Sequence, residues 1–179
     1  MDVSERPSTI VIRPATRANL PAIQAVAVQT WRHTYRKHIP LNDIVWFLDR
    51  AYAIGNLERT LANLGPGMMV AEHHDEIVGY AMAGMNADGL AELLAIYVLP
   101  EHQGAGAGYA LWCAAIAHAS TLGAERIALW VLTANTRARL FYERQGAATT
   151  SERDLVLGRS PIRETGYALD LPATRPILE

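Results

Sequence analysis

The sequence predicts an α/β domain: a mixed, mostly antiparallel sheet of six or seven strands, with a parallel strand–helix–strand unit at its centre and helices on both faces. The first third of the chain has the hydrophobic spacing of helices, and the middle has short apolar runs separated by turn residues. Residues 103–124 carry no formal charge and lie between two such runs. Two strands joined by a helix in this way form a right-handed parallel unit.

The first third is predicted to contain one short strand and three helices. The β-branched strand ends at Pro14, and Asn19 is expected to cap the first helix. Pro40 begins the second helix, and Gly65 ends the third. The expected ranges are 9–13 for the strand and 19–35, 40–48 and 57–64 for the helices.

The rest of the chain is predicted to alternate between strands and helices. The first two strands form a hairpin around the polar stretch at residues 73–76, and Gly146 ends the last helix. The expected strands are 68–72, 77–83, 91–99, 126–132 and 167–171, and the expected helices are 106–122 and 136–145. Because repeats and low-complexity segments are absent, residues 8–173 are expected to form a single domain between short flexible termini at 1–7 and 174–179.

The composition excludes several classes of function. The 16 Lys and Arg residues against 18 Asp and Glu residues give a formal net charge of −2, which lacks the electropositive footprint of a nucleic-acid binder. Residues 103–124 could span a membrane, but their high alanine and glycine content favours a helix buried in the domain. Cys113 is the single cysteine, and residues 1–7 lack a signal-peptide pattern, so a cytoplasmic location is expected. We expect neither nucleic acid nor a membrane as a partner.

A glycine-rich turn stands between an expected strand and the start of a helix. It reads Gln103-Gly104-Ala105-Gly106-Ala107-Gly108. Backbone N–H groups without helical partners and the positive end of the helix dipole make such a turn a phosphate site. A dinucleotide fingerprint would need glycine where Tyr109 stands, and the Gly-Lys-Ser/Thr of a P-loop is absent. The glycines alone fit a phosphate-binding turn and a purely structural tight turn equally well.

Two motifs of the sequence resemble those of the GCN5-related N-acetyltransferase (GNAT) family, and they occur in the same order as in that family. Gln103, Gly106 and Gly108 match its acetyl-CoA motif, Gln/Arg-x-x-Gly-x-Gly/Ala. Residues 135–147 resemble its Asn-x-x-Ala-x-x-Phe-Tyr-Glu-x-x-Gly-Phe motif, except that Ala147 replaces the final aromatic residue. The resemblance implies the fold of that family and an N-acetyltransferase that moves an acetyl group from acetyl-CoA directly to a primary amine in a ternary complex.

The resemblance also implies which residues hold acetyl-CoA. The pyrophosphate would rest on the N–H groups of residues 103–109, and the pantetheine arm would run along residues 96–98 as an additional strand. The N–H of Val98 would polarise the thioester carbonyl. Asn135 would hydrogen-bond the pantetheine, cap its own helix, or do both. The expected cofactor-binding residues are Ile96, Tyr97, Val98, Gln103, Gly104, Ala105, Gly106, Ala107, Gly108, Tyr109 and Asn135.

Glu92 and Tyr142 are the expected catalytic residues. A lysine-like amine with a pKa of about 10.4 must lose a proton before it attacks, so a base is needed. Alternation along the strand would place Glu92, Leu94, Ile96 and Val98 on one face, and Glu92 would act as the base directly or through water; otherwise it is a solvent-facing charge. Tyr142 would protonate the leaving thiolate, or else be a core residue. Trp130 stands where some relatives carry their glutamate.

The acceptor is less well defined. Trp31 and Tyr35, four residues apart, either line its pocket or pack the helices onto the sheet. A small amine, an amino acid or an antibiotic-like amine is expected; the alternatives are a protein or peptide N-terminus and a non-catalytic acyl-CoA-binding module. The candidates to attract a cationic amine are Asp43, Glu58 and Glu72. Trp46 and Cys113 are expected in the core. Because the histidines lack zinc-ligand spacing, no metal is expected. A homodimer is compatible with the family.

Overall fold

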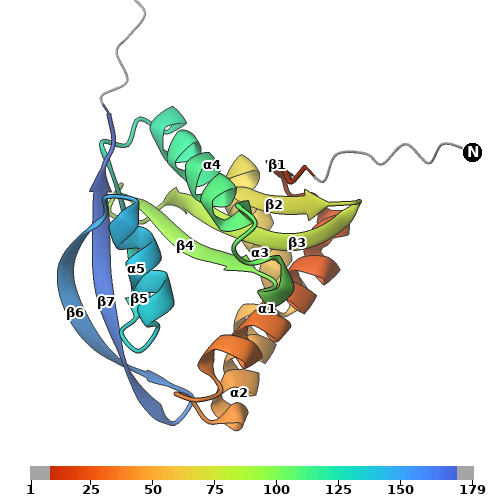
Figure 1. Ribbon diagram of the computed structural model, residues 1–179, viewed down its shortest axis with the longest axis vertical. Coiled ribbons are helices and arrows are strands. Elements are labelled where there is room, and N and C mark those ends of the chain that lie inside the picture. The colour runs from red at the N-terminus through yellow and green to blue at the C-terminus, as the bar shows by residue number, and fades with distance from the viewer. Residues whose placement is uncertain (1–8, 173–179) are drawn as a thin grey trace, which may run out of the picture.

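The computed structural model describes residues 9–172, which contain a seven-stranded sheet in the order β1-β2-β3-β4-β5-β7-β6 (Figure 1). The expected flexible termini lie outside the described residues. Neighbouring strands are antiparallel except β4 and β5, which are parallel, as the strand–helix–strand pattern predicted. The strands are β1 (Val11–Pro14), β2 (Met68–His73), β3 (Glu76–Met85), β4 (Ala91–Val98), β5 (Arg126–Leu132), β6 (Ala148–Leu157) and β7 (Ser160–Asp170).

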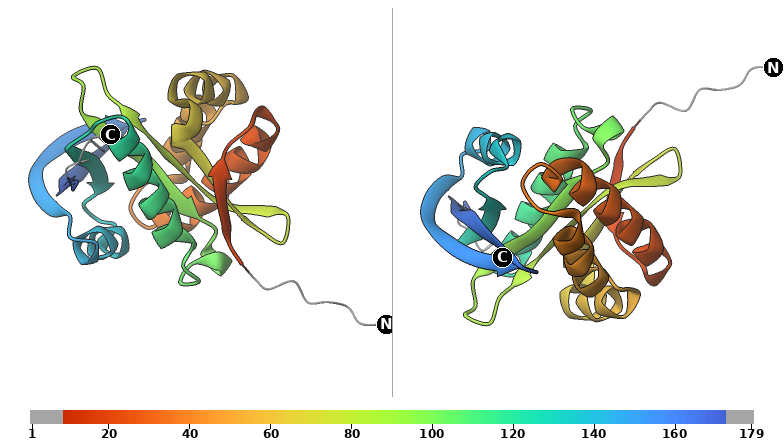
Figure 2. Two further views of the ribbon diagram at one scale, coloured as in Figure 1. Left: turned by 90° about the horizontal axis from the view of Figure 1, so that it is seen from above. Right: turned by 90° about the horizontal axis from the view of Figure 1, so that it is seen from below.

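Five α-helices of the described chain cover the two faces of this sheet (Figure 2). One group comes before β2 and lies on one face: α1 (Leu20–Tyr35), α2 (Leu41–Ala51) and α3 (Ile54–Leu64). The other face is covered by α4 (Ala107–Thr121) and α5 (Thr136–Arg144). Short 3-10 turns lie at Arg17–Asn19, Gly65–Gly67 and Pro100–His102. The predicted α/β class, the mixed sheet and the helices on both faces are confirmed.

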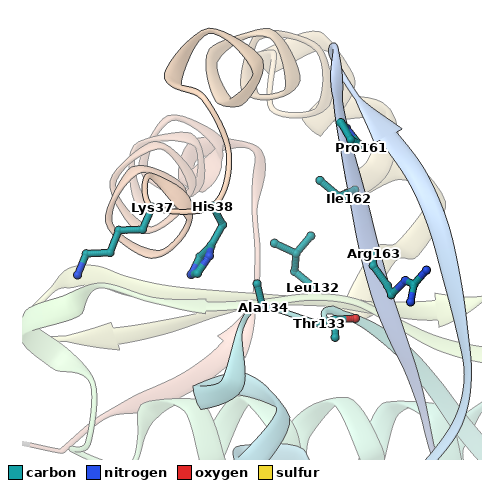
Figure 3. A pocket seen from close by; sticks show the side chains of 8 residues that line it. All are labelled: Lys37, His38, Leu132, Thr133, Ala134, Pro161, Ile162 and Arg163. Carbon is teal, nitrogen blue, oxygen red and sulfur yellow. The ribbon is translucent and has the colours of Figure 1, made fainter.

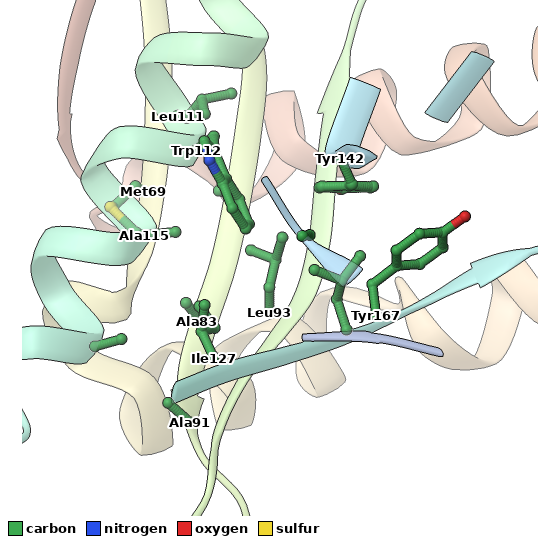
Figure 4. Close-up of a cluster of buried hydrophobic side chains, with 14 of the residues drawn as sticks. Met69, Ala83, Ala91, Leu93, Leu111, Trp112, Ala115, Ile127, Tyr142 and Tyr167 are labelled. Carbon is green, nitrogen blue, oxygen red and sulfur yellow. The ribbon is translucent and has the colours of Figure 1, made fainter. Parts of the chain in front are cut away.

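Each face of the sheet has its own hydrophobic core. Under α4 and α5, Leu111 and Trp112 pack on sheet residues such as Leu93 and Ile127 (Figure 4). Because every second residue of a strand points to the same face, the two cores share the strands between them. At roughly 25 cal/mol per Å² of apolar surface removed from water, these two cores are the main stabilising contribution to the fold.

Helix α4 has one buried face rather than an all-round apolar environment. Leu111, Trp112, Ala115 and Ala119 lie against the sheet, whereas Cys113 is exposed. The prediction that Cys113 belongs to the core is therefore wrong. One residue along a helix turns the side chain by about 100°, and this step carries Cys113 away from the sheet that Trp112 contacts.

The hairpin formed by β6 and β7 was missed except for the end of β7. Almost every residue of β6 is exposed, and Leu157 is its one buried position. Ion pairs cross between the two strands, with Arg153 bound to Glu164 and Arg163 bound to Asp154. An edge strand held by exposed charged pairs shows little hydrophobic alternation, so its sequence does not have the pattern of a half-buried strand.

Strand β4 contains a β-bulge at Leu94. Ala95 is opposite Met82 and Leu93 is opposite Ala83, so Leu94 has no residue opposite it on β3. The extra residue reverses the alternation along the strand. Ile96 and Val98 lie on the α4 face, whereas Ala95 and Tyr97 lie on the α1–α3 face. Glu92, which alternates with the α4-facing Ala91 and Leu93, is on the α1–α3 face, so the prediction that it shares a face with Ile96 and Val98 is wrong.

Candidate functional site

The centre of the sheet opens between β4 and β5. The two strands pair only where residues 91–93 meet residues 127–129, and the rest of β4 has no partner on that side. The N–H of Leu99 donates to the Val78 carbonyl on β3 at 2.8 Å. Because backbone groups of alternate residues point to the same neighbour, Tyr97 also faces β3, while Ile96 and Val98 face the gap. The expectation that Tyr97 offers its backbone to a ligand is corrected on this ground.

The glycine turn follows at the open end of this gap. Gly104 and Gly106 have φ angles of +85° and +91°, which glycine adopts without strain. The side chain of Gln103 donates from Nε2 to the Val98 carbonyl at 2.8 Å and so ties the turn to β4. Helical bonding begins with the Ala110 N–H donating to Gly106 at 2.9 Å, so the N–H groups of Ala107, Gly108 and Tyr109 at the start of α4 have no helical acceptor.

Gly108 differs from the other glycines of the turn. Its φ is not positive, and a Cβ placed there would meet only the Val98 Cγ2, at 4.0 Å. Neither backbone conformation nor packing within the protein requires a glycine at this position. The missing side chain leaves free space beside the N–H groups of the first turn, which suits the close approach of a phosphate.

Asn135 begins α5 beside the gap. Its Oδ1 accepts from the Ala138 N–H at 3.1 Å, so the helix-cap role is present in the structure. Its Nδ2 donates to the Tyr35 hydroxyl at 3.4 Å, which links α5 to α1 across the sheet. The Asn135 amide thus caps the start of α5 and also hydrogen-bonds a residue of α1 on the other face of the sheet.

Tyr142 is buried between the sheet and α4. Its ring meets Trp112 edge-on at a centroid distance of 5.5 Å. Its hydroxyl forms no hydrogen bond with any described residue and is not sealed from solvent. Burial raises the pKa of Tyr142 well above that of a free tyrosine, with a smaller contribution from Tyr35, so the hydroxyl stays protonated and can donate.

An aromatic cluster fills the α1–α3 side of the gap. Trp31 stacks on Phe47 at a centroid distance of 4.2 Å and lies 4.6 Å from Tyr35. These buried contacts favour the packing interpretation of Trp31, whereas the Tyr35 hydroxyl reaches Asn135. The Trp31 Nε1 and the Tyr80 hydroxyl are buried without a hydrogen-bond partner among the described residues.

Trp46 is 42% exposed and carries Arg50 over its ring at 4.2 Å, so the prediction that it packs in the core is wrong. Trp46 lies on the solvent side of α2, two residues after the buried Ile44 and two before the buried Leu48. Its indole therefore contacts an arginine guanidinium rather than filling the space between helix and sheet.

The acidic residues considered for an amine are mostly occupied. Glu72 pairs with Arg13, and Glu58 pairs with Arg17. Asp43 accepts from the Arg159 N–H and from the Ser160 hydroxyl. Glu92 is partly exposed and forms no ion pair with a described residue, so it is the candidate base that stays available. No group of three or more His, Cys, Asp or Glu side chains in residues 9–172 could hold a metal ion.

A cavity of about 560 Å³ lies between the end of α1 and strand β7 (Figure 3). Lys37 and His38 border it on one side, and Pro161 and Ile162 border it on the other, with the end of β5 between them. None of these residues was predicted from the sequence to line a site. The basic run from 32 to 38 was the available signal, but only the fold shows that part of it borders a cavity. No helix within residues 9–172 is long and apolar enough to cross a membrane.

Comparisons with known proteins agree with this architecture. A model of the acetyltransferase (GNAT) family matches residues 28–147. An uncharacterized N-acetyltransferase of Mycobacterium tuberculosis (strain ATCC 25618 / H37Rv) is 32% identical over 136 residues, which are 76% of this chain and 87% of that protein. Mycothiol acetyltransferase of Streptomyces griseus is 38% identical over 91 residues, 50% of this chain and 29% of that protein.

Two solved structures resemble the fold over most of its length. The PaiA N-acetyltransferase from Thermoplasma acidophilum in complex with coenzyme A has a TM-score of 0.78 at 20% identity, covering 90% of this chain and 99% of that one. The structure of yncA from Salmonella typhimurium with its cofactor acetyl-CoA has a TM-score of 0.67 at 25% identity, covering 92% and 95%. In both, the fold accompanies a bound CoA molecule.

Proposed function

The chain belongs to the GNAT family of acetyltransferases and uses acetyl-CoA, and from this premise we propose that it transfers the acetyl group directly to the primary amine of a small acceptor. Acceptor and thioester would meet in the gap between β4 and β5. The observation that carries the proposal is this gap, because it joins an unpaired backbone edge, a phosphate-type turn and a free tyrosine hydroxyl.

In this proposal, the CoA molecule replaces the missing neighbour of β4. Ile96 and Val98 supply the backbone groups that face the gap, and the amides of the pantetheine pair with them. The pyrophosphate rests on the first N–H groups of α4, with Gly108 leaving it room. The N–H of Val98 remains the candidate donor to the thioester oxygen, since its carbonyl already accepts from Gln103.

The transfer step forms a C–N bond and breaks the C–S bond of the thioester. The ammonium form of the acceptor first gives a proton to Glu92, directly or through water, because only the neutral amine has a lone pair for attack. After the attack, the nitrogen loses its second proton and the sulfur leaves as a thiolate, which accepts one proton. The products are the amide, the CoA thiol and one proton released to solution.

Tyr142 would serve the leaving sulfur as a hydrogen-bond donor. A CoA thiolate has a pKa of about 8.5, whereas burial holds the pKa of Tyr142 above 10. Full proton transfer from this tyrosine to the sulfur is therefore uphill. A donated hydrogen bond still stabilises the developing negative charge, and any proton that the tyrosine gives up must return from solvent.

Turnover can be tested by following CoA release with a panel of primary amines and peptides. We expect Tyr142→Phe to lower kcat by roughly tenfold to a hundredfold while the Kd of acetyl-CoA changes little. Tyr167→Phe is the matched control, because that hydroxyl is bonded to Arg139 and Glu143 away from the gap. Glu92→Gln should lower kcat most at low pH, and Glu125→Gln, an exposed glutamate directly before β5, should not.

Two outcomes would contradict the proposal. Unchanged turnover across pH in both Glu92→Gln and Tyr142→Phe would remove the assigned roles. Tight acetyl-CoA binding without CoA release for any amine or peptide would instead support a non-catalytic acyl-CoA-binding module.

A further inference from the structure

We propose that the acceptor carries an anionic group, a carboxylate or a phosphate, and that this group binds beside Lys37 and His38 in the cavity between α1 and β7. The inference rests on the proposed function, because it names the acceptor class of the same site. A molecule with an amine at one end and an anion at the other would lie along the α1 side of the sheet.

The cavity is adjacent to the place where the amine must react. Lys37 and His38 follow Tyr35 by two and three residues, and Ala134 directly precedes Asn135. The Asn135 amide donates to the Tyr35 hydroxyl at 3.4 Å, so the Lys37–His38 side of the cavity and the segment after β5 both lead to this contact. Trp31, one turn before Tyr35, lies at a centroid distance of 6.2 Å from Tyr97 of β4, so this end of α1 faces the strand that borders the gap. In this proposal, the acceptor extends from the gap past this contact into the cavity.

The charge of the cavity is positive and uncompensated. The residues that line it include Lys37, His38 and Arg163, and no carboxylate is among them. Arg163 is neutralised by Asp154, at 2.7 and 3.0 Å. The side chains of Lys37 and His38 form no hydrogen bond or ion pair with any described residue. In a chain with a net charge of −2, the unpaired Lys37 ammonium, next to an imidazole that can donate a hydrogen bond, favours an anion at this cavity.

A purely structural explanation accounts for only part of this basic segment. Cations at the end of a helix interact favourably with its dipole, and Arg32 and His33 in the last turn of α1 can do so. Lys37 and His38 lie beyond that turn. In Figure 3, the His38 ring projects toward the end of β5, and the Lys37 side chain extends on the far side of that ring from Leu132 and Ile162.

The remaining lining residues and the volume indicate a small acceptor. Leu132, Ala134, Pro161 and Ile162 supply apolar surface between the basic wall and β7. A volume of about 560 Å³ is within the usual range for small-molecule sites. The chemistry fits a short carbon chain that joins an amine to a carboxylate or a phosphate, as in an amino acid or a phosphorylated amino alcohol.

The test compares matched acceptors that differ in the anion alone. Free amino acids are compared with their carboxamides, and O-phosphoethanolamine is compared with ethanolamine, by the rate of CoA release from acetyl-CoA. We expect the anionic member of at least one pair to be preferred by roughly tenfold or more in kcat/KM, mainly through KM. Preference within the first pair indicates a carboxylate, and preference within the second indicates a phosphate.

Charge variants identify the residues responsible. Lys37→Gln should reduce the preference for the anionic acceptor over its neutral partner, measured as the ratio of their kcat/KM values, and Lys37→Glu should reverse that preference. Arg36→Gln is the matched control, because it removes one charge from the same end of α1 without lining the cavity. If Lys37→Gln melts at a lower temperature than Arg36→Gln, His38→Gln replaces it in the comparison.

The outcomes separate the two proposals. If neutral and anionic acceptors react equally and Lys37→Gln behaves like Arg36→Gln, the anionic acceptor is wrong while acetyl transfer to an amine stands. If a peptide is acetylated faster than every small amine, the small anionic acceptor is also wrong. If acetyl-CoA binds but no amine releases CoA, the proposed function fails and the inference fails with it.

Discussion

Replacing Asp43 should loosen the hairpin that borders the cavity between α1 and β7. Asp43 lies on α2 and is 9% exposed. Its Oδ1 accepts from the Arg159 N–H at 3.0 Å, and its Oδ2 accepts from the Ser160 hydroxyl at 2.6 Å. These two bonds join a helix of the first third to the β6–β7 turn more than 100 residues later. The turn leads directly into Pro161 and Ile162, which line the cavity.

The structure allows the cost to be estimated. A hydrogen bond to a charged group contributes about 1.5–3 kcal/mol, and two bonds on one carboxylate are not fully additive. We expect Asp43→Ala to lower the free energy of unfolding by about 3 kcal/mol, which for a chain of this size lowers Tm by about 6–12 °C. Asp43→Asn should cost about half as much, because its Oδ1 can still accept and the Ser160 hydroxyl can rotate to accept from the new amide.

Urea unfolding and acceptor kinetics together test this reasoning. Asp49→Ala is the control, since Asp49 is exposed on the same helix and should change stability by less than about 0.5 kcal/mol. Asp43→Ala should also raise the KM of the acceptor while the KM of acetyl-CoA stays the same. If Asp43→Ala is no less stable than Asp49→Ala, or if both KM values rise together, the tie between α2 and the hairpin does not have the assigned role.

Three further predictions concern other parts of the chain. Gly108→Ala should leave the free energy of unfolding unchanged or raise it by up to about 1 kcal/mol, because the new Cβ meets only Val98 at 4.0 Å. The same change should weaken CoA binding roughly tenfold, measured by calorimetry, because the methyl group occupies the space assigned to the phosphate. An unchanged CoA affinity would show that the phosphate does not use this space. Cys113 should react with iodoacetamide in the native protein at nearly the unfolded rate and without loss of turnover, and a protected thiol would disprove its exposure. Burial raises the pKa of Tyr52 to about 12 and also raises the pKa of Tyr142. The stability that comes from keeping these two hydroxyls protonated is therefore present below pH 10 and should be lost toward pH 12. Tyrosinate absorbance from these two residues that appears near pH 10, before the protein unfolds, would contradict this prediction.

The sequence was most informative where local pattern decides structure. Strand 126–132 has the predicted limits, and the turn before α4 is where the glycines indicated. The bulge at Leu94 depends on how β4 pairs with β3, a relation between distant segments that local alternation does not contain. For this reason the face assigned to Glu92 relative to Val98 was wrong although its strand was right.

The misplaced side chains have a related cause. Apolar composition predicted burial for Trp46 and Cys113, but each lies on the outward side of an otherwise well-predicted helix. Strand β6 was missed because cross-strand ion pairs, such as Arg153 with Glu164, hold it in place of a hydrophobic face. The basic wall of the cavity becomes visible only when the end of α1 is placed next to β5 and β7.

The opening between β4 and β5 gives the protein a sheet edge in its interior. Exposed edges invite other chains to pair with them and cause aggregation, but this edge lies between two halves of one sheet, with helices on both faces. In the free protein, the amides of Ile96 and Val98 should exchange with solvent like those of a loop, while that of Leu99, bonded to β3, is protected. Such a residue-by-residue alternation of protection, lost when CoA binds, would show the ligand completing the sheet.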